Sequence, residues 1–261
     1  MALDDVGFDT KTPHVVSGAA LFPIMNAIDS IVVIHGVLKR VRQKTPFNHH
    51  SASVMPLCRT AFESSSQSIW MLSPADRDGR RRRAAGSSLV GAGQKYSHLD
   101  TELKAHDAGK QLIPEPYLSE MRDHLKFSKE ELDAVRTVNC EPANFSKMVA
   151  EAGKWLHANP PTHLSAELGH LDLSTRIDQQ YRICSSVAHG YNWATDFVAA
   201  EGIGGIAKML ADAIAVAVYV TESAVCLFEA QATNRASAPP RPRNHPGRLQ
   251  PTIGSWSSMY A

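Results

Sequence analysis

Apolar residues recur along most of this chain at the three- and four-residue intervals that are typical of α-helices. Prolines, capping residues such as Asp76 and Ser128, and Gly190 separate the periodic segments. Neither a strand-type alternation nor a fixed repeat interrupts the pattern. The sequence therefore predicts an all-α protein with helices near residues 17–42, 53–72, 76–108, 116–126, 128–141, 144–157, 173–189 and 204–232.

The predicted helices indicate one domain with two loose ends. We expect residues 17–232 to form a single helical bundle. Its core should consist of the helices at 53–72, 173–189 and 204–232, the last of which is nearly apolar all round. Residues 1–16 should be a loose lead-in. Residues 233–261 carry prolines interleaved with arginines and few apolar residues, so we expect a disordered tail there.

Charge and hydropathy narrow the range of partners. The 27 lysines and arginines nearly balance the 26 acidic residues, so a net charge of +1 gives no general attraction to nucleic acid or membrane. Any site for a polyanion must therefore be local. The most apolar stretch, residues 206–228, is interrupted by Lys208, Asp212 and Glu222, and the N-terminus is acidic, unlike a signal peptide. We expect a cytoplasmic protein that does not associate with a membrane.

Metal and disulfide chemistry are not expected. The four cysteines lie far apart without a CxxC pair, and the histidines lack the spacing of zinc ligands. The cysteines are therefore interpreted as separate small core residues of a reducing compartment. No cofactor is expected.

The segment from Tyr181 to Gly190 carries the strongest indication of chemistry. In a helix, seven residues bring Arg182 and His189 to within roughly 20° of each other, two turns apart. Ser185 and Ser186 lie between them on the same face. A fixed cation beside a titratable imidazole could neutralise a phosphate and move a proton, as metal-independent RNA cleavage requires. The structural alternative is that His189 meets unpaired carbonyls at the helix end while Arg182 pairs with a carboxylate.

The same residues resemble a known motif. Arg182-x6-His189 at a helix end resembles the Arg-x4–6-His signature of HEPN-type helical proteins. Tyr181, Ser185 and His189 also resemble a Tyr-x3-Ser-x3-His pattern in a broader set of all-helical proteins. Those proteins commonly carry an earlier helix like the one that holds Arg59, Glu63 and Trp70 here.

The resemblance implies an α-helical bundle, often a homodimer, in which arginine and histidine meet at an RNA-cleaving cleft. Carried over to this sequence, it assigns catalytic roles to Arg182 and His189 alone. The residue after the arginine is usually polar in that family, and here it is Ile183.

Arg59 and Glu63 form a charged i,i+4 pair on the otherwise apolar helix at 53–72. Charges on such a helix are costly to bury unless they are paired. In the functional interpretation, Glu63 orients Arg182 or His189 and Arg59 supplies a second cation for phosphate. In the structural one, the two form an ordinary surface ion pair within the helix. The pair is also the first candidate for contact with the helix that carries Arg182.

Another group of charges is the run Arg80, Arg81, Arg82 and Arg83. Four successive helical residues fan over about 300°, so at least one should meet an acidic group, a phosphate or a partner. Contact with an RNA backbone is one interpretation. A solvated, salt-bridged helix start is the other. The glycines that follow at residues 86–93 lack a Walker pattern and are expected to allow close helix packing.

Two hypotheses for the function follow. The first is a HEPN-like, metal-independent endoribonuclease of toxin or defence type that binds RNA. In it, Arg182 stabilises the phosphorane, His189 transfers the proton, and Ser185 or Glu63 orients them. The second is a non-catalytic helical scaffold or partner-binding protein in which the same residues hold helices together.

Overall fold

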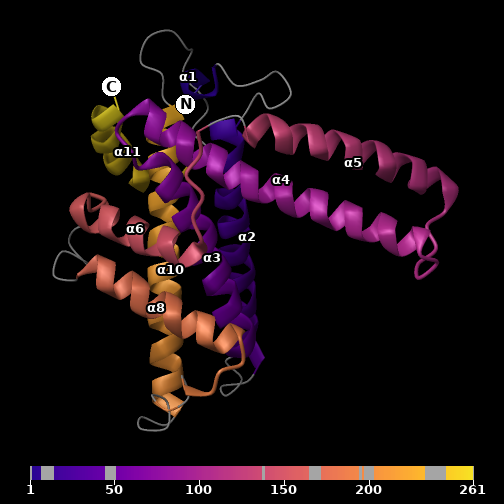
Figure 1. Ribbon diagram of the computed structural model, residues 1–261. Coiled ribbons are helices and arrows are strands. Elements are labelled where there is room, and N and C mark those ends of the chain that lie inside the picture. The colour runs from indigo at the N-terminus through magenta and orange to yellow at the C-terminus, as the bar shows by residue number, and fades with distance from the viewer. Residues whose placement is uncertain are drawn as a thin grey trace. The chain divides into compact units, whose positions relative to one another are not determined.

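The computed structural model describes residues 2–6, 15–44, 51–136, 139–164, 172–193, 196, 203–232 and 245–260, and the prediction of an all-α protein is confirmed (Figure 1). The long helices are α2 (Val15–Lys44), α3 (Ser51–Leu72), α4 (Arg77–Asp107), α5 (Glu115–Arg136), α6 (Phe145–Ala158), α8 (Leu173–Ala188) and α10 (Ile203–Ala232). Shorter elements are α1 (Ala2–Asp5), α11 (Gln250–Ser257) and two 3-10 turns, η1 (Gly247–Leu249) and η2 (Ser258–Tyr260).

The helices belong to two compact units, whereas the sequence predicted one bundle over residues 17–232. Unit 1 comprises Met1–Ala19 and Asp76–Ala143, and unit 2 comprises Ala20–Ala75 and Asn144–Ala261. The difference has a simple cause. Periodicity reveals that a helix has an apolar face, but it does not reveal which other helix covers that face.

In unit 1, α4 and α5 lie side by side as a helical hairpin (Figure 1). Leu103, Ile113 and Leu118 form its buried cluster, and Met121 and Leu125 pack against them. The sequence predicted a break between residues 126 and 128, but α5 is continuous and Ser128 is buried within it. The apolar stripe continues through this serine to Leu132, so burial of the stripe outweighs the capping tendency of Ser128.

Residues 2–6 are helical or turn and are fixed to α4, which corrects the prediction of a loose lead-in for the part of 1–16 that is described there. The Asp4 side chain is buried, and its carboxylate is held by Arg80.

In unit 2, α3 contributes the largest share of the core and contacts α6, α8 and α10. Its Phe62, Ile69 and Trp70 are fully buried. Small residues let the neighbouring backbone approach, and the Ser65 hydroxyl donates to Thr221 Oγ1 of α10 at 3.1 Å. The buried positions agree with the predicted core helices at 53–72, 173–189 and 204–232.

The C-terminal segment is ordered over residues 245–260, so the prediction of a disordered tail for 233–261 is wrong there. Residues 233–244 lie outside the described residues. Leu249, Ile253 and Trp256 share one helical face and are buried, and the Trp256 ring meets Trp155 of α6 edge-on at 4.9 Å between centroids. Three apolar residues at i, i+4 and i+7 are enough to dock a short helix although its surroundings are rich in proline.

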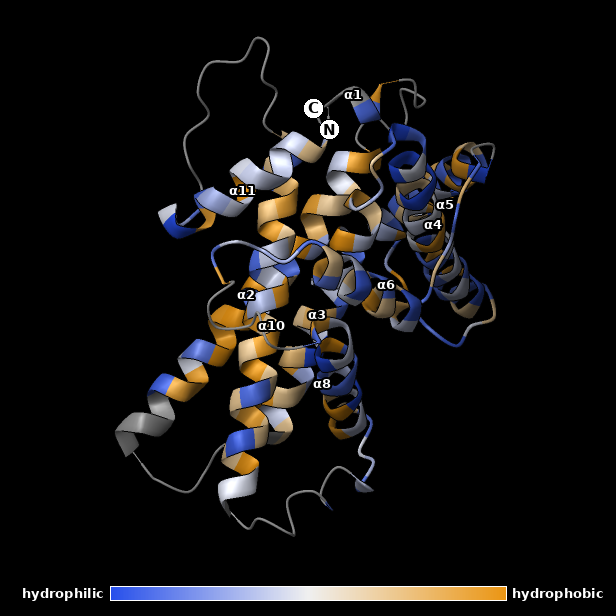
Figure 2. Ribbon diagram, turned by 90° about the vertical axis from the view of Figure 1, so that its left-hand side faces the viewer, coloured by the Kyte–Doolittle hydropathy of each residue, from blue (hydrophilic) through white to orange (hydrophobic). Residues whose placement is uncertain are grey.

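Two helices, α2 and α10, are long and apolar enough to cross a membrane, as judged by length and composition alone. More than half of the apolar stretch of α10 is buried inside the structure, as expected of a core helix. Apolar side chains remain exposed along α2, among them Phe22, Met25 and Val32. Figure 2 shows hydrophobic residues over much of α2 and α10.

Candidate functional site

The end of α8 sets the position of His189. The His189 backbone N–H donates to Ser185 O at 3.0 Å, which closes the last turn. Gly190 then adopts a left-handed conformation with φ of 72°, and the Tyr191 N–H donates to Ser186 O at 2.9 Å. Such a left-handed glycine ends a helix without steric strain. The predicted stop at Gly190 is therefore confirmed, and His189 is left exposed at the helix end.

His189 meets α3 rather than Arg182. Arg59 Nη1 lies 2.8 Å from His189 Nε2, and Arg59 Nε donates to Glu63 Oε1 at 2.9 Å. The Tyr181 hydroxyl donates to the same Glu63 oxygen at 3.1 Å. Tyr181, Glu63, Arg59 and His189 thus form one hydrogen-bonded chain between α3 and α8, named here the Arg59–His189 cluster. The predicted contact of the Arg59–Glu63 pair with the helix carrying Arg182 is present, although its partners are Tyr181 and His189.

The hydrogen bonds restrict the protons of this cluster. Arginine can only donate, so His189 Nε2 must accept and the ring proton lies on Nδ1. Burial, followed by the nearby Glu63 carboxylate, raises the pKa of Tyr181, which keeps its hydroxyl a donor. The imidazole is also flanked by the Tyr191 ring, 5.9 Å away between centroids.

Arg182 pairs with a carboxylate, as the structural alternative expected, and not with His189. Its Nε donates to Asp178 Oδ2 at 2.7 Å, and its side chain is 69% exposed. Two helical turns separate Arg182 from His189 by about 10 Å along the axis, whereas Asp178 is only one turn away. The spacing therefore places the two residues on one side of the helix without bringing them into contact.

Ser185 and Ser186, which lie between Arg182 and His189, form hydrogen bonds that stabilise the C-terminal end of α8. The Ser186 hydroxyl is buried and donates to Tyr191 O at 3.3 Å, and Ser185 accepts the His189 N–H through its backbone carbonyl. The Ser186 hydroxyl therefore stabilises the turn at Gly190 and does not belong to an exposed Arg, Ser, Ser, His strip as predicted.

The arginine run in unit 1 binds mostly within its own unit. Arg80 forms a two-pronged ion pair with Asp4 at 2.9 and 3.1 Å. Arg81 donates to the backbone oxygens of Asp4 and Val6, and Arg83 lies 3.7 Å from Glu141. The expectation that at least one arginine meets an acidic group is confirmed. Their role in RNA binding, like that of Arg82, stays a prediction.

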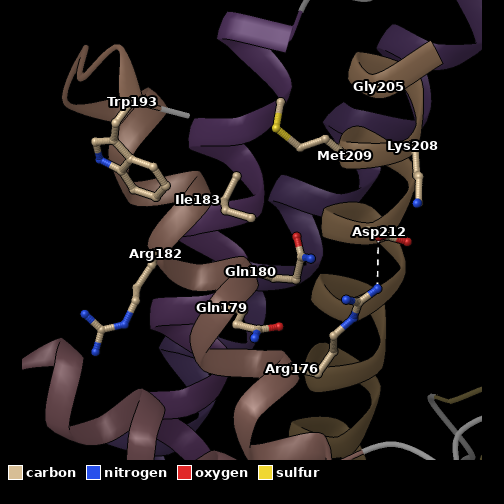
Figure 3. A pocket seen from close by; sticks show the side chains of 10 residues that line it. All are labelled: Arg176, Gln179, Gln180, Arg182, Ile183, Trp193, Gly205, Lys208, Met209 and Asp212. Atoms are coloured by element: carbon tan, nitrogen blue, oxygen red, sulfur yellow. Dashed lines mark hydrogen bonds and ion pairs between the residues drawn. The ribbon is translucent and has the colours of Figure 1, made fainter. Parts of the chain in front are cut away.

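A groove between α8 and α10 was not foreseen. It has a volume of about 480 Å³, and Arg176, Gln180 and Ile183 of α8 face α10 across it (Figure 3). These three residues are spaced by four and three positions, so their common face was visible in the sequence. The sequence did not indicate that α10 would lie opposite this face of α8.

Unit 2 also contains a buried histidine, His163, whose side chain is 3% exposed. Its Nδ1 lies 2.7 Å from Thr252 Oγ1 of α11 and its Nε2 lies 3.4 Å from Glu222 of α10. Burial lowers the pKa of His163, although Glu222 opposes this shift. Within the described ranges, no three histidine, cysteine or acidic side chains gather as ligands for a metal ion.

Comparison of this chain with protein-family models, with curated proteins and with solved structures finds no match. The geometry of the side chains therefore carries the functional argument.

Proposed function

We propose that this protein is a HEPN-like, metal-independent endoribonuclease in which His189 and Arg59 form the reacting pair. The observation that carries the proposal is the 2.8 Å contact between the exposed His189 imidazole and the Arg59 guanidinium. An acid–base group and a permanent cation are thereby held together at the surface of unit 2. Arg59 takes the phosphate-binding role that the motif had assigned to Arg182.

The proposed reaction is cleavage of the RNA backbone by the 2′-oxygen, with His189 as the base and the remaining Arg59 N–H groups as donors to the phosphate. The ribose 2′-oxygen attacks the adjacent phosphorus and the bond to the 5′-oxygen breaks, which leaves a 2′,3′-cyclic phosphate and a 5′-hydroxyl. His189 Nε2 takes the 2′-hydroxyl proton once a phosphate has drawn the Arg59 guanidinium away. The departing 5′-oxygen takes a proton from water, and the His189 imidazolium returns its own proton to the solvent. The remaining N–H groups of Arg59 stabilise the negative charge of the phosphorane.

Glu63 and Tyr181 act as positioning residues. Glu63 fixes the guanidinium through Nε, and Tyr181 fixes Glu63, so the cation keeps its direction while it changes partner. In this proposal the exposed Arg182, two turns earlier on α8, binds a neighbouring phosphate. The resemblance further implies a homodimer of toxin or defence type, and the composition of the chain favours the cytoplasm.

The test is RNA cleavage in the presence of a chelator. His189→Ala should lower the cleavage rate by about 10² to 10⁴-fold, the usual contribution of a general acid–base group. Arg59→Ala should lower it by about 10² to 10³-fold, as removal of one charge-stabilising donor does. Arg136→Ala, an exposed surface change in unit 1, is the matched control and should cleave normally. The absence of cleavage by the unaltered protein, or equal cleavage by His189→Ala, would rule out this function.

A non-catalytic scaffold or partner-binding protein is the second candidate, and one observation favours it. Each polar member of the Arg59–His189 cluster already has a protein partner, as side chains that merely join α3 to α8 would have. A scaffold role predicts that His189→Ala lowers the melting temperature and that no RNA is cleaved. The ribonuclease predicts loss of cleavage at a nearly unchanged melting temperature.

A further inference from the structure

The C-terminal segment, residues 245–260, is attached to unit 2 by a buried apolar face and one small polar cluster. The apolar face consists of Leu249, Ile253 and Trp256 and lies against α10 and α6 (Figure 1). In the polar cluster, Arg248 and Thr252 meet side chains of α10 and of the turn after α6. An element this short has fewer contacts than a core helix such as α3, so it can separate from unit 2 at a lower free energy than unfolding of the core requires.

The Glu222 carboxylate in this cluster lies within reach of two basic side chains. Arg248 Nη1 donates to Glu222 Oε2 at 2.8 Å, and Arg248 Nη2 binds the other carboxylate oxygen. His163 Nε2 lies 3.4 Å from the same Oε2, beyond the usual range of about 2.7 to 3.2 Å, and has no hydrogen-bond partner among the described residues. A protonated imidazole would form a charge-assisted hydrogen bond there and would therefore compete with Arg248 for one oxygen.

The surroundings of His163 disfavour its protonation while the segment is attached. Burial lowers the pKa of His163, Glu222 of α10 opposes this shift, and Arg248 of η1 adds to it. From α11 the imidazole meets only the neutral Thr252 hydroxyl, 2.7 Å from Nδ1. The Cys226 thiol, which also interacts with Glu222 and Arg248, stays neutral because burial raises its pKa to about 12. Departure of the segment would remove the Arg248 cation and admit water, and both changes favour the imidazolium.

We propose that acidification releases the C-terminal segment from unit 2 by exchanging the partner of Glu222. His163 takes one proton from the solvent, and its Nε2–H binds the carboxylate in place of Arg248. Residues 245–260 then leave α10, and a return to neutral pH restores the attachment. Arg248 also lines a cavity of about 400 Å³ between α8 and α10, so its departure opens one wall of that cavity. The proposal rests on the polar cluster and does not require the proposed ribonuclease activity.

The test is hydrogen exchange of the full-length protein at pH 7.5, 6.5 and 5.5, with rates corrected for the intrinsic pH dependence of exchange. Protection of the α11 amides should fall by up to about tenfold for each pH unit below 6.5, because release takes up one proton, while the α3 amides stay protected. His163→Gln should keep α11 protected throughout, and His157→Gln, an exposed histidine of α6, is the matched control that should respond like the unaltered protein. Constant protection of α11, the same response in His163→Gln, or a parallel loss in α3 would overturn the proposal.

A second variant keeps the histidine and tests the competition directly, even if His163→Gln does not fold. Arg248→Gln should lower the protection of α11 at pH 7.5, because the segment loses its ion pair with Glu222. It should also flatten the response to acid, because protonated His163 can then pair with Glu222 without displacing a cation. If Arg248 only strengthened the attachment, the variant would lower protection by the same factor at every pH. That result would overturn the exchange of partners.

Discussion

The arginines of unit 1 form a consecutive run and Arg59 of unit 2 stands alone, but the more informative difference is what these side chains contact. In unit 1, the guanidinium groups of Arg80 and Arg81 donate hydrogen bonds to the Asp4 carboxylate and to nearby backbone oxygens. In unit 2, the isolated Arg59 keeps N–H groups that neither Glu63 nor His189 uses. A dense run of positive charge therefore does not by itself indicate a ligand site. What matters is how many donors the fold leaves available.

The largest effect should come from separating the ion pair of unit 1. Arg80→Ala leaves the buried Asp4 carboxylate without its main partner, so we expect unit 1 to lose about 3 kcal/mol of stability. Hydrogen exchange of the α4 and α5 amides measures this loss. Arg136→Ala, which removes an exposed ion pair with Asp133, should cost less than about 1 kcal/mol. If Arg80→Ala weakened RNA binding and left exchange unchanged, the contrast between the units would be wrong.

A backbone contact provides the next test in unit 1. A Cβ on Gly86 would lie 2.3 Å from Glu141 O, so Gly86→Ala must displace the segment that also carries the partner of Arg83. We expect a loss of about 1 to 3 kcal/mol in a urea titration followed by circular dichroism. Gly93→Ala, on the same helix with open space around it, should instead stabilise by up to about 1 kcal/mol. Equal effects at the two glycines would contradict the tight packing at Gly86.

His163 offers the corresponding test in unit 2. Burial favours the neutral form of its imidazole, whereas the buried Asp4 carboxylate of unit 1 is paired with Arg80. The pKa of His163 is lowered in the folded state, so the unfolded chain binds the proton more readily. Stability should therefore be constant at high pH and fall as the pH drops below the ordinary value of 6.5. Thermal unfolding followed by tryptophan fluorescence between pH 8 and 5.5 measures this fall. His163→Gln should flatten the pH profile, and an unchanged slope in that variant would assign the effect to Glu222 or other groups.

The smallest effect on stability should come from Arg182. Its exposed pair with Asp178 is worth about 0.3 to 0.5 kcal/mol, so Arg182→Ala should barely change the melting temperature. If Arg182 binds a phosphate, the same change should weaken RNA binding evenly across sequences and reduce the salt dependence by about one ion. Filter binding at several salt concentrations checks both values. An unaltered salt dependence would leave Arg182 as a solvated surface residue.

The helices could be predicted from the sequence because each one is marked by local features, namely apolar periodicity and the residues at its ends. Apolar periodicity marked α3, α6, α8 and α10, and Gly190 marked the end of α8 to the residue. The contacts between one helix and another leave no comparable pattern in the sequence. The contact of Arg59 with His189 joins residues 130 positions apart. The charged Arg59–Glu63 pair on an apolar helix indicated a contact with the helix that carries Arg182, but it did not specify which side chains would meet. For Arg182 the sequence left two interpretations open, and the structure shows the carboxylate partner of the second one.

Two further differences come from competition between local and tertiary effects. Ser128 has the character of an N-cap, yet the apolar face shared with Leu118 and Leu132 keeps α5 intact. The prolines near the C-terminus indicated disorder, yet the Trp256 ring packs edge-on against the Trp155 ring. In both cases a long-range contact outweighed the local preference, and a single sequence does not display such contacts.

The left-handed residue that follows α8 has a consequence for how this surface can change. The imidazole precedes Gly190, where an added Cβ would meet no neighbouring atom but where the backbone angle is one that other amino acids adopt at a cost. A substitution there would add no clash and remove no contact, yet it would redirect the ring. The most sensitive position of the proposed reactive surface is thus one that an inventory of side-chain interactions would overlook.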